Sequence, residues 1–548
     1  MDKMTYHDKR VLIVDDHRPF LLMLRSSLNT LGVSAVTLAE SGQEAVEACN
    51  RTLFDIVISD LNLGNNRQNG LQLLQELRVK KLLSPDAIFI MISGDTERPM
   101  VIGRIEEQPD DYLIKPFSQA QLGNRLSKAE TKRKALRPLY IKLMNEDVKG
   151  AILACKDAIT SGSRYRQYCS LVMTELLWRE DKFDVALSVL EPLVRDSQLP
   201  WAVMAMAKTM MYMRQFEEAI NLAKTILDNR ILAADSHEIL AQCYLRTEKL
   251  EEACIEIKKA IELSPHSIER QYLGCEIAQA SGDYDFAKNC CLAILEQSRH
   301  SVHKNIAHMC NYIRSILELA EHATDKKSGN KFHQDAILAL QRQKQTELVK
   351  NSPQPFDFDA FENIVSARIN VIQGKLINAR RALCESQQQI EQNHDEFPMS
   401  LAPDSLKVMF DLGEYEQASS LMEKMKTSPT SSDPNTQRLL QQAISNAKRP
   451  GGDYNKLRQK GIDCYNQGQY QQAYDIFHLA LKVAPMNTGL VLNLLQVIVK
   501  LLAQKSKPDP ELKLECRQLF RSVEGLHLPE SHRDKLVALS QELQPYLG

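Results

Sequence analysis

The chain has 548 residues and a formal net charge of -2 at pH 7. A chain of this length exceeds what one hydrophobic core can organise, and the length alone predicts about three to four domains. The nearly balanced charge excludes a global attraction to nucleic acid or to an anionic membrane, so partners must be recognised locally.

The first ten residues are polar and lack the apolar core of a secretory signal, and no uninterrupted stretch reaches about 18 apolar residues. We therefore expect a cytoplasmic protein without membrane insertion. The twelve cysteines lie mostly on apolar helical positions, without CxxC pairs or histidines at zinc-ligand spacing. This pattern favours reduced thiols in the protein core.

Up to residue 127, short apolar runs alternate with amphipathic helical segments. Such alternation predicts an α/β doubly wound five-stranded parallel sheet over residues 1–127. The expected strands are 10–14, 33–38, 54–59, 87–92 and 111–114, and the expected helices are 19–31, 43–51, 70–80, 97–107 and 118–130.

Three aspartates follow two of these strands. Asp15 and Asp16 end the first apolar run, and Asp60 ends the third. Because the carboxyl ends of parallel strands meet at one edge of a sheet, we expect the three side chains to converge. Clustered carboxylates repel one another unless a cation joins them, and a site built only of oxygen ligands suits Mg²⁺. The sequence therefore predicts a magnesium site.

Further polar residues end the fourth and fifth strands. Ser93 closes the fourth, and Lys115 with Pro116 closes the fifth. Together with the aspartates, this constellation resembles the flavodoxin-like receiver domain of two-component response regulators. The resemblance implies that Asp60 accepts a phosphoryl group from a cognate histidine kinase or phosphotransfer protein.

The resemblance also implies roles for the remaining positions. Asp15, Asp16 and Asp60 would bind Mg²⁺, and the backbone carbonyl of Asn62 would be an additional ligand. Ser93 and Lys115 would contact the phosphoryl group, while the Tyr112 ring would relay the change outward. Pro116 is the candidate for a cis peptide bond.

One loop departs from the family pattern. Gly64 and Gly70 stand four and ten residues after Asp60, so the segment 64–69 is two residues longer than usual. Its polar, glycine-containing composition predicts mobility beside the site. Every ligand remains in place, and we expect phosphorylation to survive.

Residues 128–137 are basic and rich in helix formers. They predict a helical linker that runs on from the fifth helix. We interpret this run of charges as a face exposed to solvent. A nucleic-acid contact is less favoured, because no basic stripe continues beyond the run.

Beyond the linker, a small residue recurs at intervals of 35, 33, 34 and 34 residues. Each copy lies three residues after a bulky one, and apolar residues follow on the same helical face. The pattern resembles the tetratricopeptide repeat, a pair of antiparallel helices. The recurring residues are Ala151, Ala186, Ala219, Ala253 and Ala287.

A further copy occurs at 461–485, with looser copies at 374–379 and 413–418. Residues 300–352 are helical but off register, and the prolines at 352–355 indicate a break. We predict two all-α stacks of tetratricopeptide type, at 138–350 and 357–548. Such stacks have a concave groove that binds extended protein segments, so the expected partner is an unknown protein.

The preferred interpretation is a phosphorelay response regulator whose repeats bind or release a protein partner. The alternatives are a scaffold that works without phosphorylation and a phosphate sink. No catalytic output domain or DNA-binding signature follows the receiver, which argues against a separate enzyme and against direct DNA binding. In relatives, the face formed by the fourth helix, fifth strand and fifth helix binds targets or dimerises. Homodimer formation is therefore a further alternative for this chain.

Overall fold

The computed structural model describes the chain apart from residues 1–5, 65–67, 95–107, 198, 230–231, 300, 351–354, 428–432, 505–508, 525–527, 529 and 548. The expected helix 97–107 and most of the expected break at 352–355 therefore lie outside the described residues.

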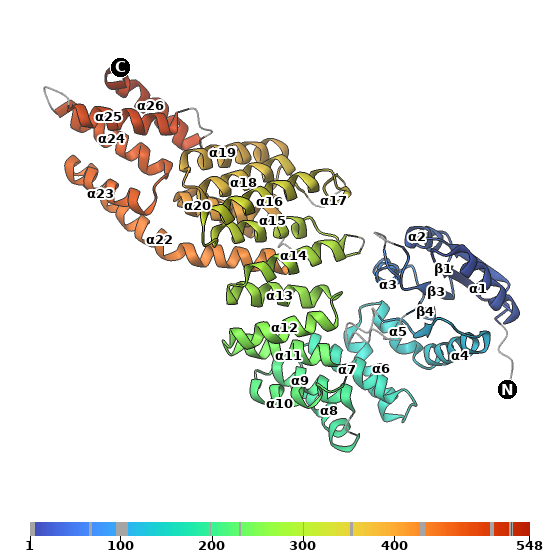
Figure 1. Ribbon diagram of the computed structural model, residues 1–548. Coiled ribbons are helices and arrows are strands. Elements are labelled where there is room, and N and C mark those ends of the chain that lie inside the picture. Colours follow the sequence, from blue (N-terminus) through green and yellow to red (C-terminus); the bar gives the residue numbers. More distant parts are fainter. Residues whose placement is uncertain are drawn as a thin grey trace. The chain divides into compact units, whose positions relative to one another are not determined.

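The N-terminal region forms the predicted sheet, in which all neighbouring strands are parallel and the order is β2-β1-β3-β4-β5. This order, with helices on both faces, confirms the doubly wound fold (Figure 1). The strands are β1 (Arg10–Val14), β2 (Ala35–Ala39), β3 (Ile56–Asp60), β4 (Ile88–Ser93) and β5 (Asp111–Ile114).

Alternating residues of β1 supply the cores on the two faces of the sheet. Val11 and Ile13 pack among residues of α1 (Arg18–Thr30) and α4 (Gln119–Ala135). Leu12 and Val14 pack instead among residues of α2 (Gly42–Arg51) and α3 (Gly70–Val79). Because successive strand side chains point to opposite faces, a run that is apolar at every position must be covered on both sides.

The basic linker is helical, but its charged face is not wholly solvated. Arg133 is only 8% exposed, which corrects the expectation of a solvent-facing run. Its Nε and Nη2 atoms donate hydrogen bonds of 2.6 and 2.9 Å to Asp110, just before β5. Its guanidinium carbon lies 3.9 Å from the ring centre of Tyr140 in the next helix. The linker is therefore packed against both the sheet and the first repeat.

From α5 to α12 the helices form antiparallel pairs (Figure 1). Four of the recurring alanines lie in the second helix of a pair, and the fifth, Ala287, lies in α14; all five are fully buried, which is why a small residue is needed there. The helices are α5 (Arg137–Met144), α6 (Val148–Thr160), α7 (Arg166–Arg179), α8 (Phe183–Ser197), α9 (Pro200–Tyr212), α10 (Phe216–Thr225), α11 (Ala233–Arg246), α12 (Leu250–Leu263), α13 (Ile268–Ser281) and α14 (Tyr284–Ser298).

The turn inside each of these pairs, and the turn that precedes α14, contains one residue in the left-handed conformation. It lies two positions before the next helix, with φ between 54° and 77°. Before α14 this residue is a glycine, but inside the pairs it carries a side chain, at a cost of roughly 1–2 kcal/mol each. The residues are Glu146, Asp181, Arg214, Glu248 and Gly282.

The remaining residues form a second helical region. The structure divides into two compact units, Met1–Asp283 with Glu296–Lys304, and Tyr284–Leu295 with Asn305–Gly548. The domain limits drawn from the sequence stay predictions. The helices are α15 (Ile306–Glu321), α16 (Lys326–Lys344), α17 (Glu347–Lys350), α18 (Phe358–Ile372), α19 (Leu376–Asn393), α20 (Ala402–Leu412), α21 (Tyr415–Thr427), α22 (Pro434–Asn466), α23 (Tyr470–Val483), α24 (Thr488–Gln504), α25 (Pro510–Val523) and α26 (Glu530–Leu547), with a 3₁₀ turn at Met399–Leu401.

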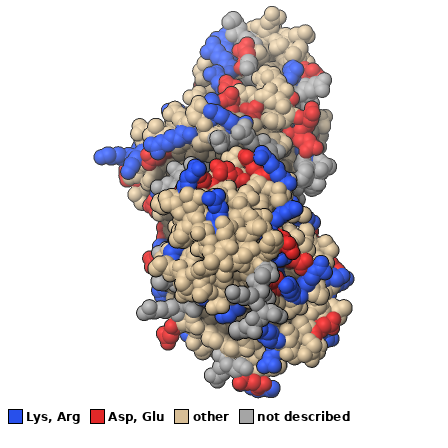
Figure 2. Space-filling view, turned by 90° about the vertical axis from the view of Figure 1, so that its right-hand side faces the viewer, with Lys and Arg blue, Asp and Glu red and all other residues tan. Residues whose placement is uncertain are grey.

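Charged residues of both signs are interspersed on the face shown in Figure 2, and neither sign forms a continuous band there. This distribution agrees with the nearly neutral net charge. Within the described part of the chain, no helix has both the length and the apolar character needed to cross a membrane.

Candidate functional site

The three predicted aspartates converge at the carboxyl edge of the sheet. Asp15 and Asp16 follow β1, and Asp60 ends the neighbouring strand β3. One carboxylate oxygen from each lies within 4.8 Å of the others. Asp15 is buried, Asp60 is partly buried and Asp16 is exposed, so the cluster opens to solvent on one side. This set of oxygen donors fits a hard cation such as Mg²⁺.

Lys115 lies between two of these carboxylates. Its Nζ donates hydrogen bonds to Oδ2 of Asp15 at 2.9 Å and to Oδ2 of Asp60 at 3.0 Å. The ammonium also lies 4.0 Å from the ring centre of Phe20 in α1. The backbone N–H of Lys115 donates to the carbonyl of Ser93 at 2.8 Å, which ties the ends of β4 and β5 together. The lysine therefore partly neutralises the acidic cluster.

Burial and charge act against each other on Asp60 and Lys115. Burial raises the pKa of Asp60, and the Asp15 carboxylate adds to the rise, while the hydrogen bond and charge of Lys115 lower the pKa. For Lys115, burial lowers the pKa, but the hydrogen bonds to Asp15 and Asp60, together with the negative charges of the two carboxylates, outweigh burial and leave the pKa raised. The ammonium form of Lys115 is thus strongly favoured at neutral pH.

Backbone amides orient the two carboxylates that Lys115 contacts. The His17 N–H donates to Oδ1 of Asp15 at 2.8 Å, and the Leu61 N–H donates to Oδ1 of Asp60 at 3.0 Å. Each carboxylate therefore has one oxygen held by the backbone and the other directed at Lys115. The Asp60 side chain is fixed at the strand end before any ligand arrives.

The other predicted residues surround this centre. Ser93 is 5% exposed at the end of β4. Tyr112 is partly buried, and burial raises the pKa of its hydroxyl to about 12. Asn62 is exposed, and the Lys115–Pro116 peptide bond is cis. The roles assigned to these residues stay predictions, but their positions are compatible with them.

Two residues at the site were missed from the sequence. Phe20 supplies the ring beneath the Lys115 ammonium, and no motif marks it. Gly70 begins α3, and a Cβ atom there would lie 2.2 Å from the carbonyl oxygen of Asp60. The sequence places Gly70 directly after the long loop, but its contact with the Asp60 carbonyl arises only in the folded chain.

Two protein-family models match the chain. Residues 11–127 match the response regulator receiver domain, and residues 461–487 match the tetratricopeptide repeat.

Two curated relatives match part of the chain. The alkaline phosphatase synthesis transcriptional regulatory protein PhoP of Bacillus subtilis is 29% identical over 146 residues, which cover 27% of this chain and 58% of that protein. The alginate biosynthesis transcriptional regulatory protein AlgB of Pseudomonas syringae is 31% identical over 163 residues, which cover 30% of this chain and 34% of that protein. The chain thus spans less than two thirds of either relative.

Among solved structures, the chemotaxis protein CheY4 of Vibrio cholerae has 24% sequence identity to the chain. The likeness covers 22% of this chain and 98% of that protein, with a TM-score of 0.20.

Proposed function

Because residues 11–127 form a response regulator receiver domain, we propose that this protein is a phosphorelay response regulator. It accepts a phosphoryl group on Asp60 and controls the binding of a protein partner through its helical repeats. The observation that carries the proposal is the intact constellation around Asp60, in which Lys115 contacts Asp60 directly and Asp15 and Asp16 lie within reach of a shared cation.

The proposed chemistry is a phosphoryl transfer from a phosphohistidine of a partner protein. A bond forms between an Asp60 carboxylate oxygen and phosphorus, and the bond from phosphorus to the histidine nitrogen breaks. Asp15, Asp16, Asp60 and the Asn62 carbonyl would hold Mg²⁺, which supplies positive charge to the phosphoryl oxygens. Lys115, already in contact with Asp60, would supply a second positive charge to the phosphoryl oxygens.

The output is proposed to be protein binding. The match at residues 461–487 and the helix pairs from α5 onward support a repeat surface of the kind that holds extended protein segments. Contacts between Arg133, Asp110 and Tyr140 connect the receiver to the first pair. No separate catalytic domain is proposed. The transcriptional role named for the two relatives is not transferred, because the matches cover only 27% and 30% of this chain.

The proposal is tested by capture of proteins from the source cell on the immobilised full chain. The compared forms are the wild type with and without acetyl phosphate and Mg²⁺, and Asp60→Asn treated identically. We expect a partner whose captured amount changes at least tenfold on phosphorylation of the wild type and does not change for Asp60→Asn. Equal capture in every arm would favour the scaffold, and fast loss of label without any change in capture would favour the phosphate sink.

A further inference from the structure

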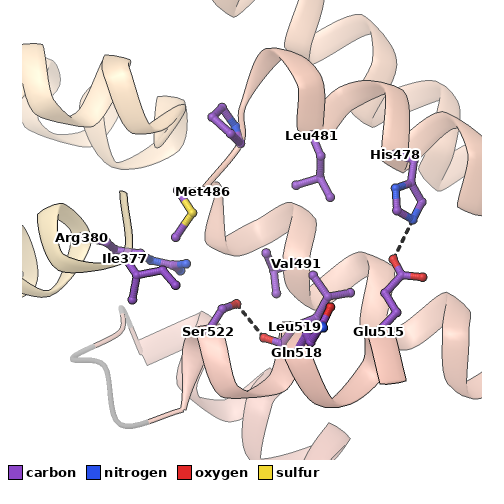
Figure 3. Close-up of a pocket in the computed structure, with 11 residues that line it drawn as sticks. Ile377, Arg380, His478, Leu481, Met486, Val491, Glu515, Gln518, Leu519 and Ser522 are labelled. Carbon is purple, nitrogen blue, oxygen red and sulfur yellow. Dashed lines mark hydrogen bonds and ion pairs between the residues drawn. The ribbon is translucent and has the colours of Figure 1, made fainter. Parts of the chain in front are cut away.

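A cavity of about 290 Å³ lies within the second compact unit, between α19 and the three helices α23 to α25 (Figure 3). Its wall is mainly apolar and includes Ile377, Leu481, Val491 and Leu519. The volume is at the lower limit for ligand sites, which are typically about 300–1,000 Å³. The space therefore suits a group the size of one amino-acid side chain, not a nucleotide or a large cofactor.

Arg380 provides positive charge at one end of this cavity. The residue is only 2% exposed, and its side chain extends from α19 toward the cavity (Figure 3). Its Nη2 atom donates to the Thr488 hydroxyl, whereas its buried Nη1 atom has no hydrogen-bond partner among the described residues. A buried guanidinium donor without an acceptor is unfavourable, so this atom marks where an acceptor would be bound.

The charge of Arg380 is only partly balanced within the protein. The nearest carboxylate belongs to Glu414, whose Oε1 lies 3.7 Å from Nη2, too far for a hydrogen bond. Burial lowers the pKa of Arg380 although Glu414 raises it. Burial raises the pKa of Glu414, which weakens its ability to compensate the guanidinium.

The carboxylate at the other end of the cavity is already engaged. Glu515 accepts a hydrogen bond of 2.6 Å from the Tyr474 hydroxyl at Oε2, and its Oε1 lies 2.7 Å from Nε2 of His478 (Figure 3). Both carboxylate oxygens of Glu515 thus have partners. Nearby, the Ser522 hydroxyl donates to the Leu519 carbonyl at 2.7 Å. Two buried nitrogen atoms of described lining residues have no hydrogen-bond partner, Nη1 of Arg380 and Nε2 of His478. Because Nε2 of His478 already lies beside the Glu515 carboxylate, Nη1 of Arg380 is the better donor for an anionic ligand.

We propose that this cavity binds a carboxylate carried on a small branched aliphatic group. The carboxylate accepts a hydrogen bond from Nη1 of Arg380, and the aliphatic part packs against Leu481, Val491 and Leu519. A carboxylate is favoured because charge-assisted hydrogen bonds to guanidinium are stronger than neutral ones. A small aliphatic acid and the C-terminal leucine of a peptide share this chemistry. The proposal does not depend on phosphorylation of Asp60.

The test measures binding to the full chain by isothermal titration at pH 7.5. The probes are 4-methylpentanoate and its amide, and a pentapeptide that ends in leucine with either a free or an amidated C-terminus. We expect at least one carboxylate probe to bind at least tenfold more tightly than its amide. Binding of the small acid alone identifies a metabolite site, and binding of the free-acid peptide identifies a peptide site. Equal binding of acid and amide in both pairs would overturn the proposal.

Variants locate the site. Arg380→Met should remove the preference for carboxylate over amide, with circular dichroism checking that the variant folds.

Ile377, at the cavity wall, is 52% exposed, so its replacement should not disturb the core. Ile377→Asp should weaken carboxylate binding at least threefold by repulsion. Leu479→Asp is the matched control, because Leu479 is 51% exposed and is not among the lining residues. Equal effects of the two aspartate variants would contradict the assignment.

Discussion

The Nζ atom of Lys115 lies 3.0 Å from Oδ2 of Asp60, in direct contact with the predicted phosphoacceptor. The two residues come from the ends of β5 and β3, which are not adjacent in the sheet, and Lys115 reaches across β4. The lysine therefore provides charge at the reacting carboxylate and also competes with a metal ion for its oxygen.

Removal of the Lys115 charge should separate these two effects. Lys115→Met should lower the rate of phosphorylation of Asp60 by acetyl phosphate at least tenfold, because one cation near the phosphoryl oxygens is lost. The affinity for Mg²⁺ should be equal or higher, because Asp15 and Asp60 no longer bind an ammonium. Rates come from labelling time courses, and affinity comes from calorimetry. Slow phosphorylation with tenfold weaker Mg²⁺ binding would instead indicate a disordered site.

The contact between Arg133 and Asp110 should stabilise the junction of receiver and repeats. Arg133→Met leaves the Asp110 carboxylate buried without its partner, a change that typically costs about 3–5 kcal/mol. The matched control is Arg125→Met, on the same helix, which breaks the more exposed pair with Asp111. Such exposed pairs contribute about 0–1 kcal/mol. Urea unfolding of the full chain should show the larger loss for Arg133→Met; equal losses would refute the proposed importance of the junction.

Gly413 should be the least replaceable of the turn glycines in the second unit. Its φ is +80°, and a Cβ atom there would lie 2.4 Å from the Cα of Ala484. Gly374 has a similar φ of +72° but open space around it. Gly374→Ala should cost about 1–2 kcal/mol for the left-handed conformation alone. Gly413→Ala should cost about 1–3 kcal/mol more from overpacking. Thermal unfolding measures the difference, and equal shifts would contradict the close approach.

Asp235 should make the stability of the first unit depend on pH. Burial raises the pKa of Asp235 to about 7, although Arg270 lowers it through an ion pair of 3.0 Å. Between pH 3.8 and 7 the folded state binds a proton that the unfolded state has lost, so this group makes stability fall as pH rises through that window. At pH values above the pKa in the folded state, Asp235 is ionised in both the folded and the unfolded chain, and the stabilisation by the bound proton is fully lost.

The measurement compares wild type with Asp235→Asn at pH 5.5 and pH 8. Asparagine cannot ionise, so the stability of the variant relative to wild type should be higher at pH 8 than at pH 5.5, by up to about 2 kcal/mol. Glu238→Gln removes the second carboxylate that contacts Arg270 and one of the charges that raise the pKa of Asp235, so this variant should show a smaller dependence of stability on pH than wild type. A difference between Asp235→Asn and wild type that is the same at both pH values would contradict the raised pKa.

The strands of the receiver could be predicted because their sequence pattern is local. The observed strands β1 and β5 have the expected limits, and β2 and β3 are displaced by one or two residues. Each aspartate could be placed because it ends a strand, and strand ends in a parallel sheet share an edge. The predicted core position of the cysteines is also observed, since all twelve are free and ten are buried.

Contacts between distant segments could not be predicted in the same way. Arg314, in the off-register region, and Arg368, in α18, both bind Asp404, at 2.6 and 2.7 Å, and all three side chains are almost fully buried. The sequence does not distinguish a buried arginine from an exposed one, because the carboxylate that pairs with the buried arginine lies far away in the chain. Arg133 was misassigned to solvent for the same reason, since Asp110 and Tyr140 become its neighbours only after folding.

The central claim is that Asp60 accepts phosphate, and labelling by acetyl phosphate in the presence of Mg²⁺ tests it most directly. The full-length wild type should gain about 80 Da by intact-mass spectrometry, the mass of one phosphoryl group, and peptide mapping should place the modification on Asp60. Asp60→Asn should gain none, and EDTA should prevent labelling of the wild type. Labelling of the Asp60→Asn variant to the wild-type extent would contradict the account.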